Sequence, residues 1–120
     1  MKILVVDDNV QIRVLMHDLL AEDHELSILT NGYNAVCLLS DIRHGFDLVF
    51  LDIRMPGLSG DQVLEILNDF KDTRTRFVVI SGYADHKFIP KYKNVMEFLE
   101  KPINVKDIER IVEEVEKKVR

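Results

Sequence analysis

The feature that most constrains the fold is a regular alternation between short apolar runs and segments whose apolar residues recur at helical spacing. Residues 3–6, 48–51 and 77–80 are continuous apolar runs rich in branched and aromatic side chains, which is typical of strands covered on both faces. Residues 26–29 and 95–99 are weaker strand candidates. Because parallel strands need a crossover between them, the alternation predicts a parallel sheet with helices on both faces.

The segments between these runs carry apolar residues three and four positions apart, as on one face of a helix. The turn Asn31-Gly32 precedes the second of them, and Asn104 is a candidate N-cap for the last. A further helical segment, residues 84–93, contains Pro90, which removes a backbone donor or kinks the helix. Strand and helix therefore alternate five times. The four clearer stripes are Ile12, Leu15, Met16, Leu19 and Leu20; Ala35, Val36, Leu39 and Ile42; Val63, Leu64, Leu67 and Phe70; and Val105, Ile108, Val112, Val115 and Val119.

Length and composition exclude several classes of protein. A chain of 120 residues is one domain's worth, so we expect a single domain over residues 1–120 without an output domain. The apolar runs are far shorter than the ~20 residues of a membrane span, and no signal peptide begins the chain, which favours a cytoplasmic protein. A net charge of −5 argues against nucleic acid as the main partner. A single cysteine excludes a disulfide framework.

Polar side chains follow most of the predicted strands. Asp7 and Asp8 follow the first, Asp52 the third, Ser81 the fourth and Lys101 the fifth. In open α/β sheets, ligands bind outside the carboxyl ends of the strands, where the strand order reverses. If the strand order is 2-1-3-4-5, the first and third strands are neighbours and the three carboxylates meet.

Three clustered carboxylates repel each other and cannot all remain ionised without a cation. Oxygen ligands suit a hard divalent ion such as Mg²⁺, or Mn²⁺ in its place. Lys101 and Ser81 add a positive charge and a hydroxyl donor beside the cluster, which makes the site suitable for phosphoryl oxygens. The sequence has no GxxxxGK[ST] loop, so we expect no bound nucleotide.

At these residues the chain resembles the receiver domain of two-component response regulators, over essentially its whole length. Each element alone is a weak signal, but all of them in order at these separations form a specific one. The resemblance implies the flavodoxin-like, three-layer (βα)5 fold with the strand order 2-1-3-4-5. The matching elements are Asp7-Asp8, Asp52 within Leu51-Asp52-Ile53-Arg54-Met55-Pro56-Gly57, Gly60, Ser81 within Ile80-Ser81-Gly82-Tyr83, and Lys101-Pro102.

The resemblance implies that Asp52 takes a phosphoryl group from a phosphohistidine and becomes an acyl phosphate. It further implies that Asp8, Asp52 and the backbone carbonyl of Arg54 hold Mg²⁺ directly, with Asp7 acting largely through water. The partners it implies are a sensor histidine kinase or histidine phosphotransfer protein and a downstream protein target. Such a chain is a signalling domain that catalyses only its own phosphorylation and dephosphorylation.

The family pattern also assigns roles beside the acidic cluster. Lys101 would pair with a phosphoryl oxygen, and Ser81 would swing toward the phosphoryl group. Phe98 stands where the family has an aromatic switch that turns inward when Ser81 moves. The peptide bond before Pro102 is expected to be cis.

Two positions are candidates for setting the lifetime of the phosphoryl group. Arg54 lies two residues after Asp52, and Tyr83 lies two residues after Ser81. In the family these positions flank the path of the attacking water, so two bulky side chains predict slow self-dephosphorylation. Ser81 and Lys101 are also about two residues closer than in many receivers, which leaves the segment with Pro90 as a short, kinked or mobile fourth helix.

Alternative functions remain open from the sequence. A receiver-like module could bind partners without phosphorylation, although the complete acidic set with Lys101 argues against it. A haloacid-dehalogenase-like phosphatase would need a second aspartate where Arg54 stands, and Asp7-Asp8-Asn9 does not suit the phosphate cradle of a flavodoxin-like carrier. Within the receivers, Ile12-Arg13 and Ser81-Gly82-Tyr83 favour a sporulation-type phosphorelay intermediate over a chemotaxis regulator.

The remaining reactive side chains have simpler interpretations. The histidines show no metal-ligand spacing, so we expect surface or structural roles for them. Cys37 lies near an apolar stripe and is interpreted as core packing. The run at residues 113–118 predicts a solvated helix face with the pairs Glu113–Lys117 and Glu114–Lys118.

Overall fold

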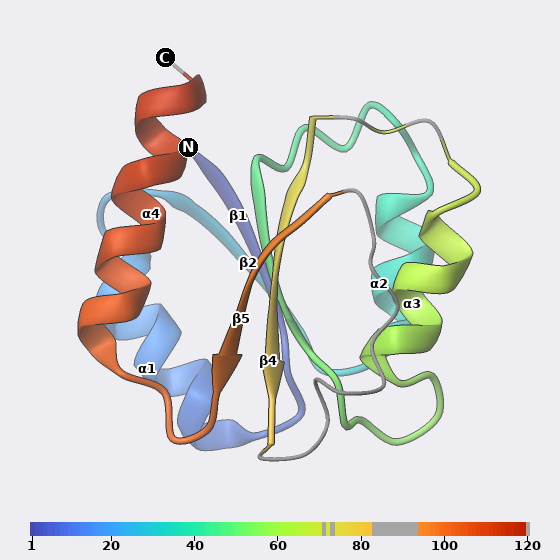
Figure 1. Ribbon diagram of the computed structural model, residues 1–120, viewed down its shortest axis with the longest axis horizontal. Coiled ribbons are helices and arrows are strands. Elements are labelled where there is room, and N and C mark those ends of the chain that lie inside the picture. Colours follow the sequence, from blue (N-terminus) through green and yellow to red (C-terminus); the bar gives the residue numbers. More distant parts are fainter. Residues whose placement is uncertain (71, 73, 83–93, 120) are drawn as a thin grey trace.

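The computed structural model describes residues 1–70, 72, 74–82 and 94–119. Five parallel strands form one sheet in the order β2-β1-β3-β4-β5, as predicted (Figure 1). The expected fourth helix with Pro90 lies outside the described residues. The strands are β1 (Lys2–Val6), β2 (Glu25–Leu29), β3 (Leu48–Asp52), β4 (Arg76–Ser81) and β5 (Val95–Glu100), and the helices are α1 (Val10–Leu20), α2 (Gly32–Leu39), α3 (Gly60–Leu67) and α4 (Val105–Val119).

The sheet separates two apolar cores because successive strand residues point to opposite faces. Helices α1 and α4 cover one face, and α2 and α3 cover the other (Figure 1). In β1, for example, Ile3 and Val5 belong to the first core, whereas Leu4 and Val6 belong to the second. Both faces of the central strands are thus apolar, so the polar groups of these strands are confined to their ends.

Helices α2 and α3 differ from the sequence prediction in three details. Cys37 is exposed, because Ala35 and Leu39 turn the opposite side of α2 toward the core. Helix α2 ends at Leu39, so Ile42 lies beyond it and is 67% exposed. Helix α3 ends at Leu67, and Phe70 is likewise exposed. The predicted cap is confirmed, since Lys106 donates its backbone N–H to the side chain of Asn104.

The charged face of α4 follows the prediction only in part. Lys117 lies 3.6 Å from Glu113, as expected from four-residue spacing. Glu114 instead pairs with Arg110, one turn earlier, at 3.3 Å. Arg110 also reaches Glu97 of β5, so this guanidinium joins the helix to the edge of the sheet.

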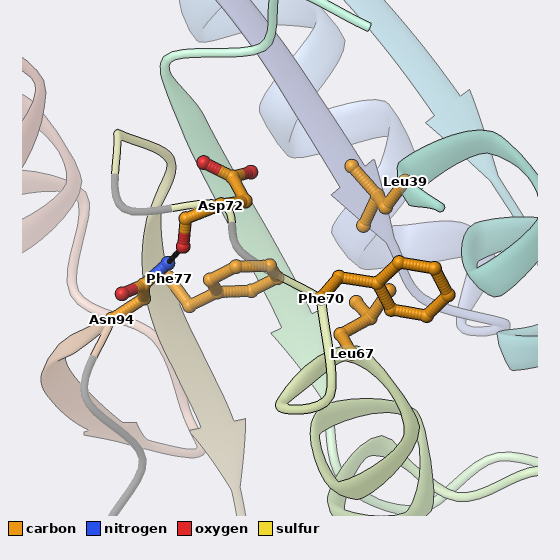
Figure 2. A pocket seen from close by; sticks show the side chains of 6 residues that line it. All are labelled: Leu39, Leu67, Phe70, Asp72, Phe77 and Asn94. Carbon is orange, nitrogen blue, oxygen red and sulfur yellow. Dashed lines mark hydrogen bonds between the residues drawn. The ribbon is translucent and has the colours of Figure 1, made fainter. Parts of the chain in front are cut away.

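A buried polar network connects the loops near the amino-terminal ends of β3 and β4. His44 is buried, as a structural histidine, and its Nδ1 accepts the backbone N–H of Phe46 while its Nε2 lies 3.1 Å from Asp72. Asp72 also accepts the backbone N–H of Thr75, and its carbonyl accepts the side-chain amide of Asn94 (Figure 2). Leu39, Leu67, Phe70 and Phe77 line a cavity of about 20 Å³ beside this contact.

Although burial raises the pKa of Asp72, the hydrogen bonds from Thr75, Arg74 and His44 outweigh it and leave the pKa below its ordinary value. The carboxylate therefore remains ionised at neutral pH and holds the loop before β4 against the loop before β3. This network is at the other end of the strands from the polar strand ends.

Candidate functional site

The register of the sheet brings the polar strand ends together. Asp52, the last residue of β3, pairs with Ile80 of β4, directly before Ser81. Asp7 follows β1 and donates its backbone N–H to Leu29 of β2. Asp7 and Asp52 are almost completely buried, at 0% and 1% exposure, whereas Asp8 is exposed. The site thus combines two carboxylates inside the protein with one at its surface.

Local hydrogen bonds shape the turn between β1 and α1. Asn9 caps α1, because its side chain accepts the backbone N–H groups of Gln11 and Ile12. The backbone N–H of Asn9 donates to Asp7 Oδ1 at 2.8 Å. One residue therefore both begins the helix and orients the first carboxylate.

Gly60 brings the start of α3 against the backbone of Asp52. Its N–H donates to the carbonyl of Ile53 at 2.8 Å. A Cβ at this position would lie 2.3 Å from the carbonyl oxygen of Asp52, inside van der Waals contact. The absence of a side chain thus permits the close approach that fixes the end of β3.

The three carboxylates form a cluster suited to a cation. One oxygen each from Asp7, Asp8 and Asp52 lies within 4.8 Å of the others. Among the described residues, Asp7 Oδ2 and Asp52 Oδ2 are buried without a hydrogen-bond partner. Buried acceptors left unpaired are costly, and an oxygen-only donor set is what Mg²⁺ prefers. The residues present fit a hard divalent cation.

Ser81 ends β4, the neighbour of β3, and Lys101 directly follows β5, the next strand. Lys101 Nζ lies 3.3 Å from Asp52 Oδ1, and the lysine side chain is one-third exposed. The backbone N–H of Lys101 donates to the carbonyl of Ser81 at 2.9 Å. Ser81 Oγ is buried and has no hydrogen-bond partner among the described residues. The nucleophile candidate, an ammonium group and a hydroxyl without a partner among the described residues therefore lie at the carboxyl ends of β3, β5 and β4.

Burial and repulsion perturb the ionisation of both inner carboxylates. Burial, followed by the negative charge of Asp7, raises the pKa of Asp52 to about 6, even though Lys101 acts in the opposite direction. Burial also raises the pKa of Asp7, against the hydrogen bond from Asn9 and the charge of Lys101. Without a cation, the cluster thus favours uptake of a proton.

The other predicted site residues lie around this cluster. Arg54 is exposed, and its backbone N–H lies 3.4 Å from Asp52 Oδ1. The peptide bond between Lys101 and Pro102 is cis, as expected. Phe98, at the position of the aromatic switch, is 43% exposed. Tyr83, the second lifetime candidate, lies outside the described residues.

Sequence reasoning missed two features beside the site. Arg13 donates to the backbone carbonyls of Asp7 and Asp8, a contact whose only trace in the sequence is an arginine one turn after the acidic pair. A hollow of about 290 Å³ lies next to Lys101, between the start of α1 and the segment after β5. Its lining residues are Asn9, Gln11, Ile12, Leu15, Lys101, Pro102 and Ile103.

Comparison with known proteins identifies the family. The family profile described as the response regulator receiver domain matches residues 3–113. This chain belongs to that family. Sporulation initiation phosphotransferase F of Bacillus subtilis is 28% identical over 110 residues, which are 89% of this chain and 86% of that protein. The receiver domain of the Francisella response regulator 1452 superposes with a TM-score of 0.83 at 21% identity, covering 99% of this chain and 98% of that one, and shows the same fold.

Other receiver relatives are longer than this chain. An uncharacterized response regulatory protein of Vibrio cholerae is 30% identical over 118 residues, which are 98% of this chain and 48% of that protein. The chain thus spans about half the length or less of the first curated relatives it matches. No helix among the described residues is long and apolar enough to cross a membrane.

The raised pKa of Asp52 predicts how stability depends on pH. Between the ordinary carboxyl pKa and about 6, the folded receiver binds more protons than the unfolded chain, so in metal-free buffer this group makes the fold more stable as pH falls from 7 to 5. Asp52→Asn removes the charge, and we expect it to raise the free energy of unfolding at pH 7 by about 1–3 kcal/mol. Chemical denaturation in the presence of a chelator measures both effects.

Asp23→Asn is the matched control, because Asp23 is an exposed carboxylate outside the cluster. It should leave the dependence on pH unchanged. A loss of stability at pH 7 in Asp52→Asn, or an unaltered slope between pH 7 and 5, would contradict the assignment of the buried charge.

Proposed function

We propose that Asp52 accepts a phosphoryl group from a phosphohistidine. A carboxylate oxygen of Asp52 attacks phosphorus, the phosphorus–nitrogen bond breaks, and the imidazole nitrogen keeps the electron pair, which leaves an acyl phosphate on Asp52. The observation that carries this proposal is the buried Asp52, 3.3 Å from Lys101 Nζ and within the acidic cluster, in a chain of the receiver family.

The acidic cluster is the proposed site of Mg²⁺, or of Mn²⁺. Asp8, Asp52 and the backbone carbonyl of Arg54 would be the direct ligands, with Asp7 acting largely through water. The bound ion would supply positive charge to the cluster and to the phosphoryl oxygens. The unpaired buried oxygens of Asp7 and Asp52 support this assignment.

Lys101 and Ser81 are the proposed ligands of the transferred group. Lys101 Nζ would leave Asp52 Oδ1 to pair with a phosphoryl oxygen, and Ser81 Oγ, which has no protein partner among the described residues, would donate to another. Phe98, in the switch position, would change its exposure with Ser81. The resulting change at the surface would alter binding to a downstream protein.

The proposed donor is a sensor histidine kinase or a histidine phosphotransfer protein. Such a donor must bring an imidazole to Asp52 past the exposed side of the cluster, where the 290 Å³ hollow adjoins Lys101. Helix α1 lines part of this hollow, and its Val10 and Val14 are 60% and 55% exposed. We therefore place donor docking on α1 and the hollow, with Ile12 and Ile103 as apolar contacts.

The output is phosphorylation-dependent protein binding or onward transfer to a second histidine. The likeness to sporulation initiation phosphotransferase F over most of both chains supports onward transfer. A cytoplasmic location agrees with such partners. A chain without an output domain stays a prediction, because its relatives include both short proteins and proteins about twice as long.

A phosphoryl group on Asp52 would be a covalent adduct that changes the mass of the chain. Incubation with Mg²⁺ and acetyl phosphate should add one phosphoryl group, detected by intact mass, and Asp52→Ala should remove this adduct. Asp23 has an exposed carboxylate outside the cluster, so the control Asp23→Asn should be labelled as the wild type is. If neither a cognate histidine donor nor beryllofluoride with Mg²⁺ modifies or binds the wild type, the chain is a binding module not regulated by phosphorylation.

The lifetime of the adduct tests the residues proposed to flank the attacking water. Replacing both Arg54 and Tyr83 by asparagine should speed loss of the phosphoryl group on the order of tenfold, because smaller side chains open the approach of water to phosphorus. Time-resolved intact mass after removal of the donor measures the decay. Exposed Arg43 offers the control Arg43→Asn; decay of the double variant at the wild-type rate would contradict the proposal.

If the donor docks on α1, a change on this helix should slow transfer from a protein donor but not from a small molecule. Val14→Glu places a charge on the exposed face of α1, so it should slow transfer from a histidine phosphotransfer protein at least tenfold. Labelling by acetyl phosphate should not change. Ile42→Glu is the matched control, because Ile42 is also an exposed apolar residue and follows α2 rather than lying on α1. Equal slowing by both variants, or slowing of acetyl phosphate labelling, would contradict docking on α1.

A further inference from the structure

Arg13 makes an unusual contact with the turn that carries the acidic pair. It lies at the end of the first turn of α1, and its Nη1 reaches back to the carbonyl oxygen of Asp8 at 2.8 Å and to that of Asp7 at 3.3 Å. The side chain is half-buried. One guanidinium nitrogen thus bridges two consecutive backbone carbonyls beside the metal site.

The geometry of this bridge bears on Asp8 in particular. The two carbonyls belong to the peptide groups on either side of Asp8, and each peptide group is planar. Holding both planes fixes the φ and ψ of Asp8 and therefore the direction of its Cα–Cβ bond. The contact with Arg13 consequently determines the direction in which the side chain of Asp8 leaves the backbone.

Asp8 has less support than the other two carboxylates of the cluster. Asp7 accepts the N–H of Asn9, and Asp52 contacts Lys101 and the N–H of Arg54. Among contacts between described residues, the side chain of Asp8 has no such partner, and it is exposed. Its placement in the cluster therefore depends on its backbone.

We propose that Arg13 is a positioning residue for Asp8, and that it strengthens metal binding by fixing the two peptide groups around this ligand. The inference rests on the proposed function of the cluster as a Mg²⁺ site. The direction of the change in Mg²⁺ affinity is informative, because the positive charge of a guanidinium beside a cation site by itself weakens cation binding by repulsion. Geometry and charge therefore predict opposite effects when Arg13 is replaced.

Lysine is a sharp test, because it keeps the charge without the planar guanidinium that bridges the carbonyls. We expect both Arg13→Met and Arg13→Lys to weaken Mg²⁺ binding on the order of tenfold, as measured by calorimetric titration of the whole chain, since loss of an outer support of a metal ligand has effects of that size. Arg43→Met removes an exposed guanidinium that pairs with Asp41, away from the cluster, and should bind as the wild type does.

The rate of labelling by acetyl phosphate distinguishes weaker Mg²⁺ binding from a general loss of folded protein. In both Arg13 variants the Mg²⁺ concentration for half-maximal rate should rise, while the rate at saturating Mg²⁺ stays close to that of the wild type. Unfolding curves establish that each variant is folded, and Arg13→Lys carries the test if Arg13→Met does not fold.

The contrary outcomes are distinct. Unchanged or tighter Mg²⁺ binding by Arg13→Met, or wild-type binding by Arg13→Lys, overturns the positioning role and leaves the proposed function intact. If the wild type itself binds no Mg²⁺, the metal site fails, and the role of Arg13 fails with it.

Discussion

The repulsion between two buried carboxylates is the interaction on which the site depends. Asp7 and Asp52 are removed from water at adjacent strand ends, and each retains a buried oxygen without a partner among the described residues. Lys101 offsets part of this repulsion, but the pKa of Asp52 is still raised to about 6 by burial and by Asp7. The folded chain therefore holds a local excess of negative charge that a cation or a proton relieves.

The sheet makes this arrangement possible because the apolar residues that stabilise the fold lie on its two faces, whereas the polar residues of the site lie at the ends of the strands. Both faces of the central strands are apolar and covered by helices, so the strands can be continuous hydrophobic runs. Their carboxyl ends then lie side by side in parallel register and carry the polar groups together. The amino-terminal ends hold a different polar network, in which His44, Asp72 and Thr75 satisfy one another. The mutually repelling buried carboxylates are thus confined to the carboxyl ends of the strands.

Much of the fold and the site could be predicted from sequence because both depend on strand periodicity. The ends of the predicted strands carry Asp7, Asp52, Ser81 and Lys101, and a parallel sheet places such ends side by side. The sequence prediction is wrong for Cys37, because apolar spacing alone does not define which side of the short helix α2 faces the core. Cys37 lies opposite the buried Ala35 and Leu39 and is exposed. The contact of Arg13 could not be predicted, because its partners are backbone carbonyls, which every sequence has.

The turn between β1 and α1 joins the acidic cluster to the hollow that is proposed to receive the donor. Asn9 orients Asp7 through its N–H, caps α1 through its side chain and also lines the hollow beside Lys101. Arg13, one turn later, holds the carbonyls of the same turn. The proposed metal ligand Asp8, its backbone support and part of the proposed docking surface therefore belong to one short segment. Under the proposed function, the donor and the cation would therefore both reach Asp52 at the carboxyl ends of the strands, beside this turn.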